Sequence, residues 1–430
     1  MSNNDTLYVR TEMLDEKAPP SLNTGLVGWI KENLFPNWFS SILTVVSLYI
    51  IYVLLSALIP WMFGGVWNAT SLSECREILD GTSAACWAVI HERFWQLMYG
   101  FYPSNLYWRP NLALIMLGLA IAPVLFEGAP RKLFWVTIAM PFVGRWLLWG
   151  GTIWTPIMAA AGFVVGYFVY KLVANSMSDL AGMVLGPLAA IIWWLFLGGY
   201  VANALSSILP LAIQSVESRK FGGFMLAITL GITGIAASFP LGIILALGRQ
   251  SNLVIVKSLS VGFIEFIRGV PLITLLFVAQ VMLAYFLPKG TEFDIILRVM
   301  IMITLFASAY MAEVIRGGLA ALPKGQYEAA DALGLTYWQA QRLIIMPQAL
   351  KIAIPGIVST FIGLYKDTTL VSIIGLSDPI GWVNFIQADA NWNGIVWELY
   401  GFVAFCFFVV CFSMGRYSMY LERKLQTGHK

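Results

Sequence analysis

Charged residues are scarce in this sequence of 430 residues: Asp, Glu, Lys and Arg together make up 11% of it, whereas 59% is hydrophobic. Soluble domains carry about 25% charged residues, so the composition excludes an ordinary water-soluble domain. The formal net charge of +3 is also too small to predict a nucleic-acid partner. What the sequence has instead is long apolar runs, and about 20 apolar residues cross the ~30 Å hydrocarbon layer as a helix. The predicted fold class is therefore all-α, a polytopic helical membrane protein.

Metal-ligating and redox-active side chains are also few, with two histidines and four cysteines in the chain. Cys406 and Cys411 lie in an apolar run at a spacing that gives neither one helix face nor a metal site. Cys75 and Cys86 lie in a polar loop, where a disulfide and two free thiols are both open. A disulfide there requires the loop to face an oxidising compartment. We predict no metal site in this chain.

A nucleotide-binding loop and a secretory signal are missing as well. The sequence contains no Gly-Lys dipeptide, so it cannot form the P-loop of ATP-hydrolysing proteins. Residues 1–39 are polar and of mixed charge, without the apolar core of a signal peptide. We therefore expect residues 1–39 to form a cytoplasmic tail and the first apolar run, from Ser40, to be retained as a membrane span.

Ten apolar runs are candidate membrane spans. Lys and Arg gather in the short loops on one side of them, which the positive-inside rule makes cytoplasmic; the 206–220 loop, with Arg219 and Lys220, is a local exception. Ten spans would place both termini in the cytoplasm of a bacterium, across its inner membrane, and the 64–111 loop with Cys75 and Cys86 in the periplasm. The ten runs are Ser40–Phe63, Leu112–Phe126, Leu133–Gly150, Thr152–Val173, Leu180–Leu205, Phe221–Leu247, Val261–Leu287, Ile295–Ala312, Ile352–Leu376 and Val396–Gly415.

The distribution of polar residues divides the chain near residue 215. Residues 40–214 have few polar side chains within their spans and carry no motif, so we predict an accessory transmembrane region. Residues 215–424 carry intramembrane charges and the motifs described below, so we predict that they form the working domain. Within it, residues 313–351 form a long cytoplasmic loop between two spans.

This cytoplasmic loop has the pattern of two short helices. Gln326 to Leu333 contains good helix formers, and Gly334 can end a helix in the left-handed conformation. Thr336 then begins a capping box, T-Y-W-Q, and Pro347 limits the second helix. From these residues alone, an ordinary amphipathic surface loop and a rigid knob that docks into another protein are equally consistent.

Three motifs in this half resemble those of ABC importer permeases. The spacing E-A-A, three residues, G, nine residues, I-x-M-P reproduces the "EAA" loop of that family, with Met where Leu is usual. R-G-V-P-L resembles the R-G-T-P-L element of its polar amino acid branch, and K-D-T-T-L resembles the K-D-T-S-L element. The residues that carry the match are Glu328, Ala329, Ala330, Gly334, Ile344, Met346, Pro347, Arg268–Leu272 and Lys366–Leu370.

The resemblance implies a MetI-like transmembrane domain over residues 215–424, and the extended N-terminal half resembles the long permeases of general L-amino-acid systems. It implies a permease subunit, not an enzyme, of an importer for polar L-amino acids delivered by a periplasmic binding protein. Glu328, Ala329, Ala330, Gly334 and Pro347 would couple it to a dimer of ABC ATPase subunits, which binds ATP and Mg. A second permease subunit would complete the pathway, and both a copy of this chain and a different homologous subunit remain open.

Two pairs of charges lie within predicted spans, where ionisable groups are costly and mark function. Lys366 and Asp367, with Thr368, offer a cation, an acceptor and a hydroxyl to a zwitterionic amino acid, provided that the helix breaks there; pairing with another helix for packing or gating is the alternative. Glu265 and Arg268 lie three residues apart and are expected to pair with each other. We predict a gating or structural role for them.

Two other classes of protein compete with this interpretation. An ion-gradient-driven secondary amino acid transporter would account for Lys366 and Asp367 but would leave the cytoplasmic knob without a role. An intramembrane enzyme is disfavoured, because the spans contain no constellation of nucleophile, base or metal ligands. The knob is thus the feature that favours an ATP-driven importer.

Overall fold

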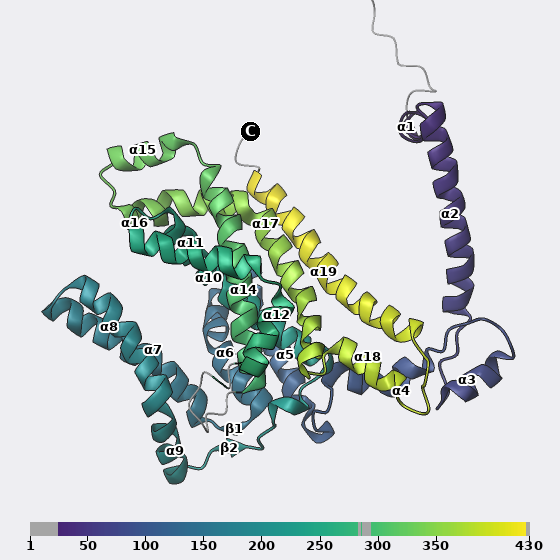
Figure 1. Cartoon of the computed structure of the whole chain (residues 1–430), viewed down its shortest axis with the longest axis horizontal. Coiled ribbons are helices and arrows are strands. Elements are labelled where there is room, and N and C mark those ends of the chain that lie inside the picture. The colour runs from purple at the N-terminus through teal and green to yellow at the C-terminus, as the bar shows by residue number, and fades with distance from the viewer. Residues whose placement is uncertain (1–24, 283–284, 286–293, 427–430) are drawn as a thin grey trace, which may run out of the picture. The chain divides into compact units, whose positions relative to one another are not determined.

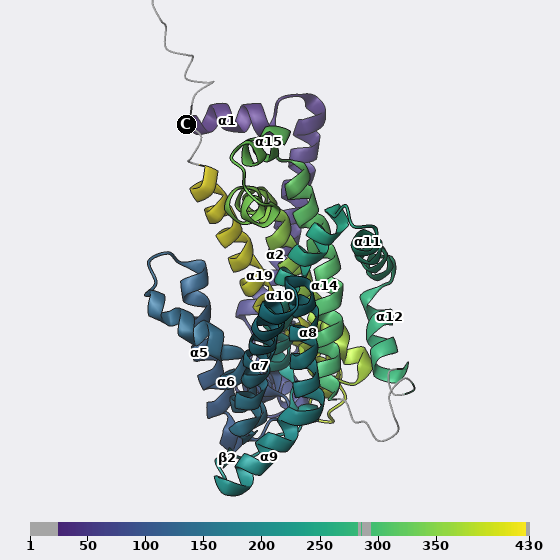
Figure 2. The same ribbon diagram turned by 90° about the vertical axis from the view of Figure 1, so that its left-hand side faces the viewer.

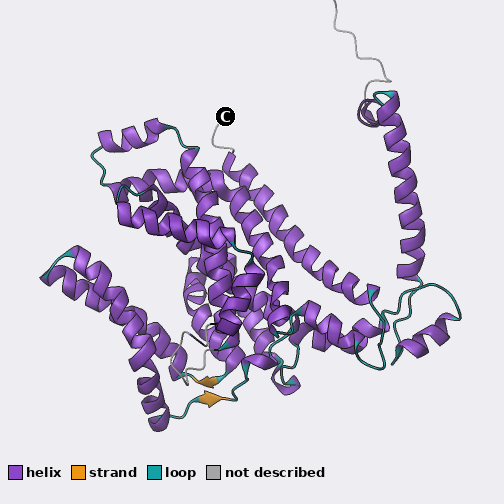
Figure 3. Cartoon of the chain, viewed as in Figure 1, coloured by secondary structure: helices purple, strands orange, loops and turns teal. Residues whose placement is uncertain are grey.

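The computed structural model describes residues 25–282, 285 and 294–426. Helices make up nearly all of the described chain, with two short strands (Figure 3). Packing separates the chain into two compact units, which are described one by one. The first comprises residues up to 69 and 73–88, and the second comprises residues 70–72 and those from 89 onward.

The first unit consists of a surface helix, one long apolar helix and a disulfide-bonded loop. These helices are α1 (Gly25–Leu34), α2 (Trp38–Phe63) and α3 (Leu72–Leu79). Asn37 caps α2 by accepting a hydrogen bond from the backbone N–H of Ser40 at 2.8 Å. No residue of α2 is buried, and its 26 residues reach ~39 Å at 1.5 Å per residue, enough to cross a bilayer.

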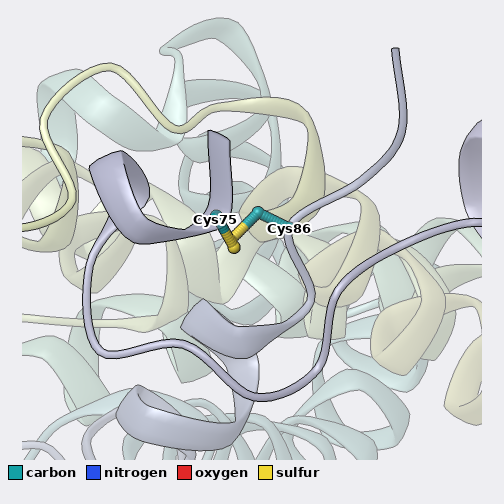
Figure 4. The surroundings of a disulfide bond; sticks show 2 residues. All are labelled: Cys75 and Cys86. Carbon is teal, nitrogen blue, oxygen red and sulfur yellow. A yellow bond between two sulfur atoms is a disulfide. The ribbon is translucent and has the colours of Figure 1, made fainter. Parts of the chain in front are cut away.

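A disulfide bond and packed tryptophan rings hold the loop after α2 in place. A disulfide joins Cys75 of α3 to Cys86, with the two Cα atoms 6.1 Å apart (Figure 4). Trp87 stacks on Trp67 at 5.9 Å, meets Trp61 edge-on at 5.7 Å, and donates its indole N–H to the carbonyl of Met62. Aromatic residues of this kind gather at membrane–water interfaces.

The core of the second unit is built on three long helices, α10 (Gly223–Gln250), α14 (Ile295–Ala320) and α17 (Met346–Asp367) (Figure 1). Small residues let these helices approach closely. A β-carbon at Gly242 of α10 would lie 2.6 Å from Cγ of Met311 on α14, so only glycine fits there. Close approach through small residues is how helices pack inside membranes, where apolar burial alone gives no preference for protein over lipid.

Other helices surround this core. They are α4 (Ala88–Tyr99), α5 (Trp108–Leu125), α6 (Phe134–Trp149), α7 (Trp154–Ser176), α8 (Asp179–Ile192), α9 (Gly198–Ile208), α11 (Val254–Gly269), α12 (Leu272–Phe277), α15 (Lys324–Ala332), α16 (Tyr337–Ala340), α18 (Pro379–Gln387) and α19 (Trp397–Gln426). Short 3-10 turns occupy Ser104–Leu106, Arg131–Leu133, Ser218–Lys220 and Thr368–Ile374, and π-helical turns occupy Trp193–Leu197, Val278–Met282 and Gln341–Ile345. Strands β1 (Gly151–Thr152) and β2 (Ala212–Ile213) pair antiparallel, with Gly151 opposite Ile213.

Within the described residues, eight helices are long and apolar enough to cross a membrane, or nine if α11 and α12 count as one broken span. The predicted span over Val261–Leu287 is not one continuous helix, because the chain bends by 101° between α11 and α12 (Figure 2). Pro271 is the reason: it holds Val270 in an extended conformation (φ −115°, ψ 133°), which ends α11. The far end of that predicted span, including Leu287, lies outside the described residues.

The predicted division near residue 215 does not appear as a gap in packing. Phe221 lies in one apolar cluster with residues from both sides of that boundary, stacking on Trp149 at 4.5 Å and meeting Tyr102 edge-on at 5.6 Å. Accessory and working regions therefore share a core. The division between them stays a prediction about function.

Candidate functional site

The predicted knob contains two helices, α15 and α16. The prediction that Pro347 ends the second helix is wrong, because α16 continues through the π-helical turn at Gln341–Ile345 into α17, where Pro347 occupies the first turn. Pro323 precedes α15, and Gly334 ends it with φ +68°, a left-handed conformation that disfavours other residues. The capping box at α16 is formed, with the backbone N–H of Thr336 donating to the side-chain oxygen of Gln339 at 2.9 Å. The knob thus has a defined shape without any partner present.

The surface of the knob is more apolar than its motif suggests. Glu328 and Ala329 are exposed, whereas Ala330 is buried against the rest of the knob. Four large apolar side chains are exposed in addition, a feature that sequence reasoning missed and that is typical of a surface awaiting a partner. They are Leu333, Tyr337, Trp338 and Leu343, with exposed fractions of 73%, 54%, 66% and 64%.

A cluster of five charges lies where α10, α11 and α14 meet, in the elements that lead into the knob. Glu313 of α14 is its centre: its carboxylate oxygens lie 3.0 Å from Arg249 of α10, 3.0 Å from Arg316 and 3.6 Å from Arg268 of α11. The Glu313 side chain is 16% exposed. These guanidinium groups are the ionic partners of a carboxylate that has little water around it.

Glu265, the fifth residue of the charge cluster, has a different partner from the one that the sequence predicted. Glu265 was expected to pair with Arg268 on its own helix, but its carboxylate instead lies 2.7 Å from Arg249 of α10. Arg268 reaches across to Glu313 and lies 5.6 Å from the ring centre of Tyr310. The charges thus join helices to one another, because α11 packs against both α10 and α14.

Lys366, Asp367 and Thr368 lie where α17 changes its winding. The α-helix ends at Asp367 and continues as a 3-10 turn from Thr368 to Ile374. Hydroxyl groups satisfy the last carbonyls: Thr368 donates to Tyr365 and Thr369 donates to Lys366, each at 2.8 Å. The break that would let Lys366 and Asp367 face one solute is therefore not present: the helix tightens at Thr368 and does not unwind.

The three side chains at this turn differ in exposure. Lys366 is exposed, Asp367 is partly buried and Thr368 is fully buried. Among the described residues, neither Lys366 nor Asp367 has an ion-pair partner within 4.0 Å. Two charges without an ion-pair partner in the described part of the chain are available to another subunit or to a solute.

Asp378, at the start of α18, is a buried acid that the sequence analysis did not single out. It accepts hydrogen bonds from the backbone N–H groups of Gly381 at 2.9 Å and Ile380 at 3.1 Å, which makes it the N-cap of the helix. Burial raises the pKa of this carboxyl to about 6, against the lowering effect of these bonds. The sequence Asp378-Pro379 could have predicted this N-cap, because an N-cap acid is often followed by proline at the first helical position.

The parts of the chain that the structure describes contain no group of three or more His, Cys, Asp or Glu side chains able to hold a metal ion. The arrangement of charged groups therefore offers contacts for a polar solute and for a protein partner.

Comparison with known proteins agrees with these features. Residues 238–427 match the family described as "binding-protein-dependent transport system inner membrane component". The glutamate/glutamine/aspartate/asparagine transport system permease protein BztC of Rhodobacter capsulatus is 55% identical over 99% of this chain and its own full length. The chain belongs to this family of ABC transporter permeases. The inner membrane amino-acid ABC transporter permease protein YhdY of Escherichia coli is 42% identical over 93% of each permease.

Among solved structures, the permease is similar to a chain described as an amino acid ABC transporter crystallised with histidines. The two are 30% identical, the match covers 46% of this permease and 91% of that chain, and the TM-score is 0.42.

Family membership settles the general role of the chain. The permease is a multi-pass inner-membrane subunit of an ABC amino acid importer, with its MetI-like domain preceded by extra N-terminal helices. It works with a binding protein and with an ATPase subunit, which binds the ATP, and it is not the catalytic subunit. Permeases of this family carry no cofactor of their own.

Proposed function

We propose that this permease forms one half of a pathway for acidic and amide L-amino acids, delivered by a periplasmic binding protein. The observation that carries the proposal is the match to BztC over its full length, because that permease is named for glutamate, glutamine, aspartate and asparagine. All four amino acids share the same zwitterionic backbone. A site that recognises this backbone serves all of them.

Lys366 and Asp367 are the residues proposed to recognise the zwitterion. Lys366 would bind the α-carboxylate and Asp367 the α-ammonium group, since each lacks an ion-pair partner among the described residues. Lys366 and Asp367 are the last two α-helical residues before the 3-10 turn, so their side chains point about 100° apart and would reach different parts of the solute. Thr368 belongs to the proposed site as the buried residue that holds this turn through its bond to Tyr365.

The knob is proposed to be the contact with the ATPase. Glu328 and Ala329 would lie in a cleft of that subunit, with Gly334 setting the turn between α15 and α16 and Ala330 buried below the exposed face. Pro347 would support the knob from the first turn of α17. Closure of an ATPase dimer would then push the knob as a rigid body. The exposed apolar side chains on the same knob, Trp338 among them, support a protein partner there.

The charge cluster around Glu313 is proposed to carry this push into the membrane. Glu313 and Arg316 lie on α14, the helix that runs directly into the knob, and Arg268 lies at the bend between α11 and α12. A movement of α14 would therefore pull on α11 through short ionic contacts. This is the gating role expected for Glu265 and Arg268, with Glu313 as its centre.

The orientation follows from the loop charges. Both termini and the knob would lie in the cytoplasm, and the disulfide between Cys75 and Cys86 would lie in the oxidising periplasm. Because one such domain is only half of a pathway, a second permease subunit would complete it. The full-length similarity to long permeases favours a different homologous subunit over a second copy.

Reconstitution tests the proposal directly. The permease, its ATPase, the second permease subunit and the binding protein would be incorporated into liposomes, and uptake of radiolabelled glutamate would be followed with and without internal ATP. We expect uptake that requires ATP and is blocked by glutamine, aspartate and asparagine but not by leucine. Uptake by the permease alone, driven by a sodium or proton gradient, would overturn the proposal in favour of a secondary transporter.

A further inference from the structure

A cavity of about 560 Å³ lies between the turn that joins α5 to α6 and the C-terminal end of α19. Helices α5 and α19 are each long enough to cross a membrane, and the cavity lies at the C-terminal end of both. It is therefore level with the headgroup layer, not with the hydrocarbon interior. Its walls are formed by Pro123, Val124, Leu125, Phe126, Glu127, Gly128, Tyr417, Tyr420, Leu421 and Lys424.

Two polar contacts between distant parts of the chain form the walls of this cavity. Nζ of Lys424 lies 2.7 Å from Oε2 of Glu127, and the hydroxyl of Tyr417 donates to the carbonyl of Leu125. The Lys424 ammonium also lies 5.9 Å from the ring centre of Tyr420. These contacts join the turn between α5 and α6 to the C-terminal part of α19.

The cavity walls combine apolar and charged side chains, which suits an amphiphilic ligand. Val124 and Phe126 are 62% and 56% exposed, which leaves an apolar surface on the membrane side of the cavity. At its charged rim, Glu127 is 82% and Lys424 is 38% exposed, so both can also interact with a ligand. A cation and an anion side by side, above exposed apolar groups, match a zwitterionic headgroup that carries acyl chains.

We propose that this cavity binds a phospholipid with a phosphate and a primary ammonium group, a phosphatidylethanolamine. The ammonium would donate to Glu127, while Lys424 and the Tyr420 hydroxyl would donate to the phosphate. The acyl chains would run along Val124 and Phe126. A bound lipid would then join the accessory helix α5 to α19, the last helix of the transport domain.

Other headgroups fit the same rim less well. Phosphatidylglycerol has the phosphate but no cation, so it would leave the Glu127 carboxylate facing a hydroxylated, anionic headgroup. Phosphatidylcholine has a quaternary ammonium, which donates no hydrogen bond to the carboxylate. The inference depends on this difference in hydrogen bonding, and it does not depend on which amino acids are transported.

Lipid retention tests the proposal on the purified complete transporter. The complex would be exchanged into nanodiscs with equal amounts of the three phospholipids, then extracted with mild detergent, and the lipid still bound would be quantified by mass spectrometry. We expect wild type to retain phosphatidylethanolamine about tenfold over the other two. Glu127→Gln should bring phosphatidylethanolamine and phosphatidylglycerol close to parity, and Lys424→Gln should lower the retention of all three.

Arg423→Gln is the matched control, because Arg423 is exposed on the same turn of α19 but does not line the cavity. Equal retention of the three lipids by wild type would overturn the proposal, as would variants at Glu127 and Lys424 that behave like Arg423→Gln. A second measurement needs no variant: phosphatidylethanolamine with a photoreactive acyl chain should label residues 123–128 or 417–424 of wild type. Labelling confined to other segments would also overturn it.

Discussion

At the scale of the single residue, Asp378 links the fold of the permease to pH. Burial raises the pKa of this carboxyl in the folded protein to about 6, from an ordinary value of 3.8. The folded protein therefore holds the proton more tightly than the unfolded chain does. The stability from this group is fully present below about pH 4, is lost as the pH rises to about 6, and stays lost above it. A difference of this size is worth on the order of 3 kcal/mol.

Replacing Asp378 by Asn should remove this pH dependence. Asn caps helices as well as Asp does, so the bonds to Gly381 and Ile380 can be kept without a titrating group. We expect the unfolding temperature of the Asp378→Asn complex to be at least that of wild type at pH 7.5 and to vary less between pH 4.5 and 7. Asp378→Ala should be less stable at every pH, by about 1 kcal/mol, because it loses the cap. Equal pH profiles for wild type and Asp378→Asn would contradict the assignment.

Lys366 should be needed for transport but not for assembly. If its ammonium binds the α-carboxylate, Lys366→Met removes a charge-assisted contact that nothing else in the described chain replaces. We expect ATP-driven glutamate uptake by the reconstituted transporter to fall at least tenfold, with the complex still intact on gel filtration. Lys351→Met, at the start of the same helix, is the control and should retain most uptake. Uptake in Lys366→Met equal to that of the control would exclude the proposed contact.

Individual residues also show how far the sequence could lead. Spacing alone identified Gly334 as a helix end and Thr336 with Gln339 as a capping box, because these signals depend on local backbone chemistry. The partner of Glu265 could not be read in the same way. Its contact with Arg249 depends on how two helices meet, and the sequence predicted only the local pair.

At the scale of the helix, Glu313 is the residue on which the contact between α10, α11 and α14 depends. Glu313→Gln would leave Arg249, Arg268 and Arg316 with only the exposed Glu265 to balance them, so these helices should separate or shift. We expect ATP hydrolysis by the reconstituted transporter to lose most of its stimulation by loaded binding protein. Glu265→Gln, which removes a 54% exposed carboxylate, should have a much smaller effect. A larger loss of stimulation in Glu265→Gln than in Glu313→Gln would show that Glu313 is not the centre of the charge cluster.

The α7–α8 hairpin depends on two glycine pairs, Gly162 with Gly166 and Gly182 with Gly186. A β-carbon at Gly186 would lie 2.8 Å from Cβ of Tyr170 and 2.9 Å from the carbonyl oxygen of Gly166. Gly186→Leu should therefore push α7 and α8 apart and lower the unfolding temperature of the complex by several degrees. At Gly199, in α9, a β-carbon would meet nothing within 4 Å, so Gly199→Leu should be tolerated. Similar unfolding temperatures for the two variants would show that the hairpin is not closely packed.

Helices also differ in how well hydropathy predicts them. Most predicted spans correspond to a helix, because a long apolar run has few alternatives in lipid. The run Val261–Leu287 is not a single helix, since hydropathy registers the apolar side chains on both sides of Pro271 but not the change in backbone direction there. The Gly-Val-Pro element was expected to disturb the helix, but a bend of 101° depends on what α11 packs against.

At the scale of the whole molecule, the permease depends on partners, and its knob has the exposed surface for one of them. Composition and motifs were enough to predict the fold class, because long apolar runs leave a local signature, and the ATPase contact of the knob stays a prediction. Motifs could not predict the exposed side chains of Leu333 and Trp338, because exposure depends on the tertiary structure. The same apolar residues could have packed against the knob itself.

The final prediction separates the shape of the knob from its chemistry. Gly334 has φ +68°, and a β-carbon there would meet nothing within 4 Å in the free permease, so its conformation is what requires glycine. Asn tolerates this left-handed conformation and Val does not. We therefore expect Gly334→Val to lose at least tenfold in the amount of ATPase that co-purifies with the permease, and Gly334→Asn to lose much less. If both variants lost the ATPase equally, contact of the glycine itself with the partner would be the cause. If both kept it, the angle between α15 and α16 would have no part in docking.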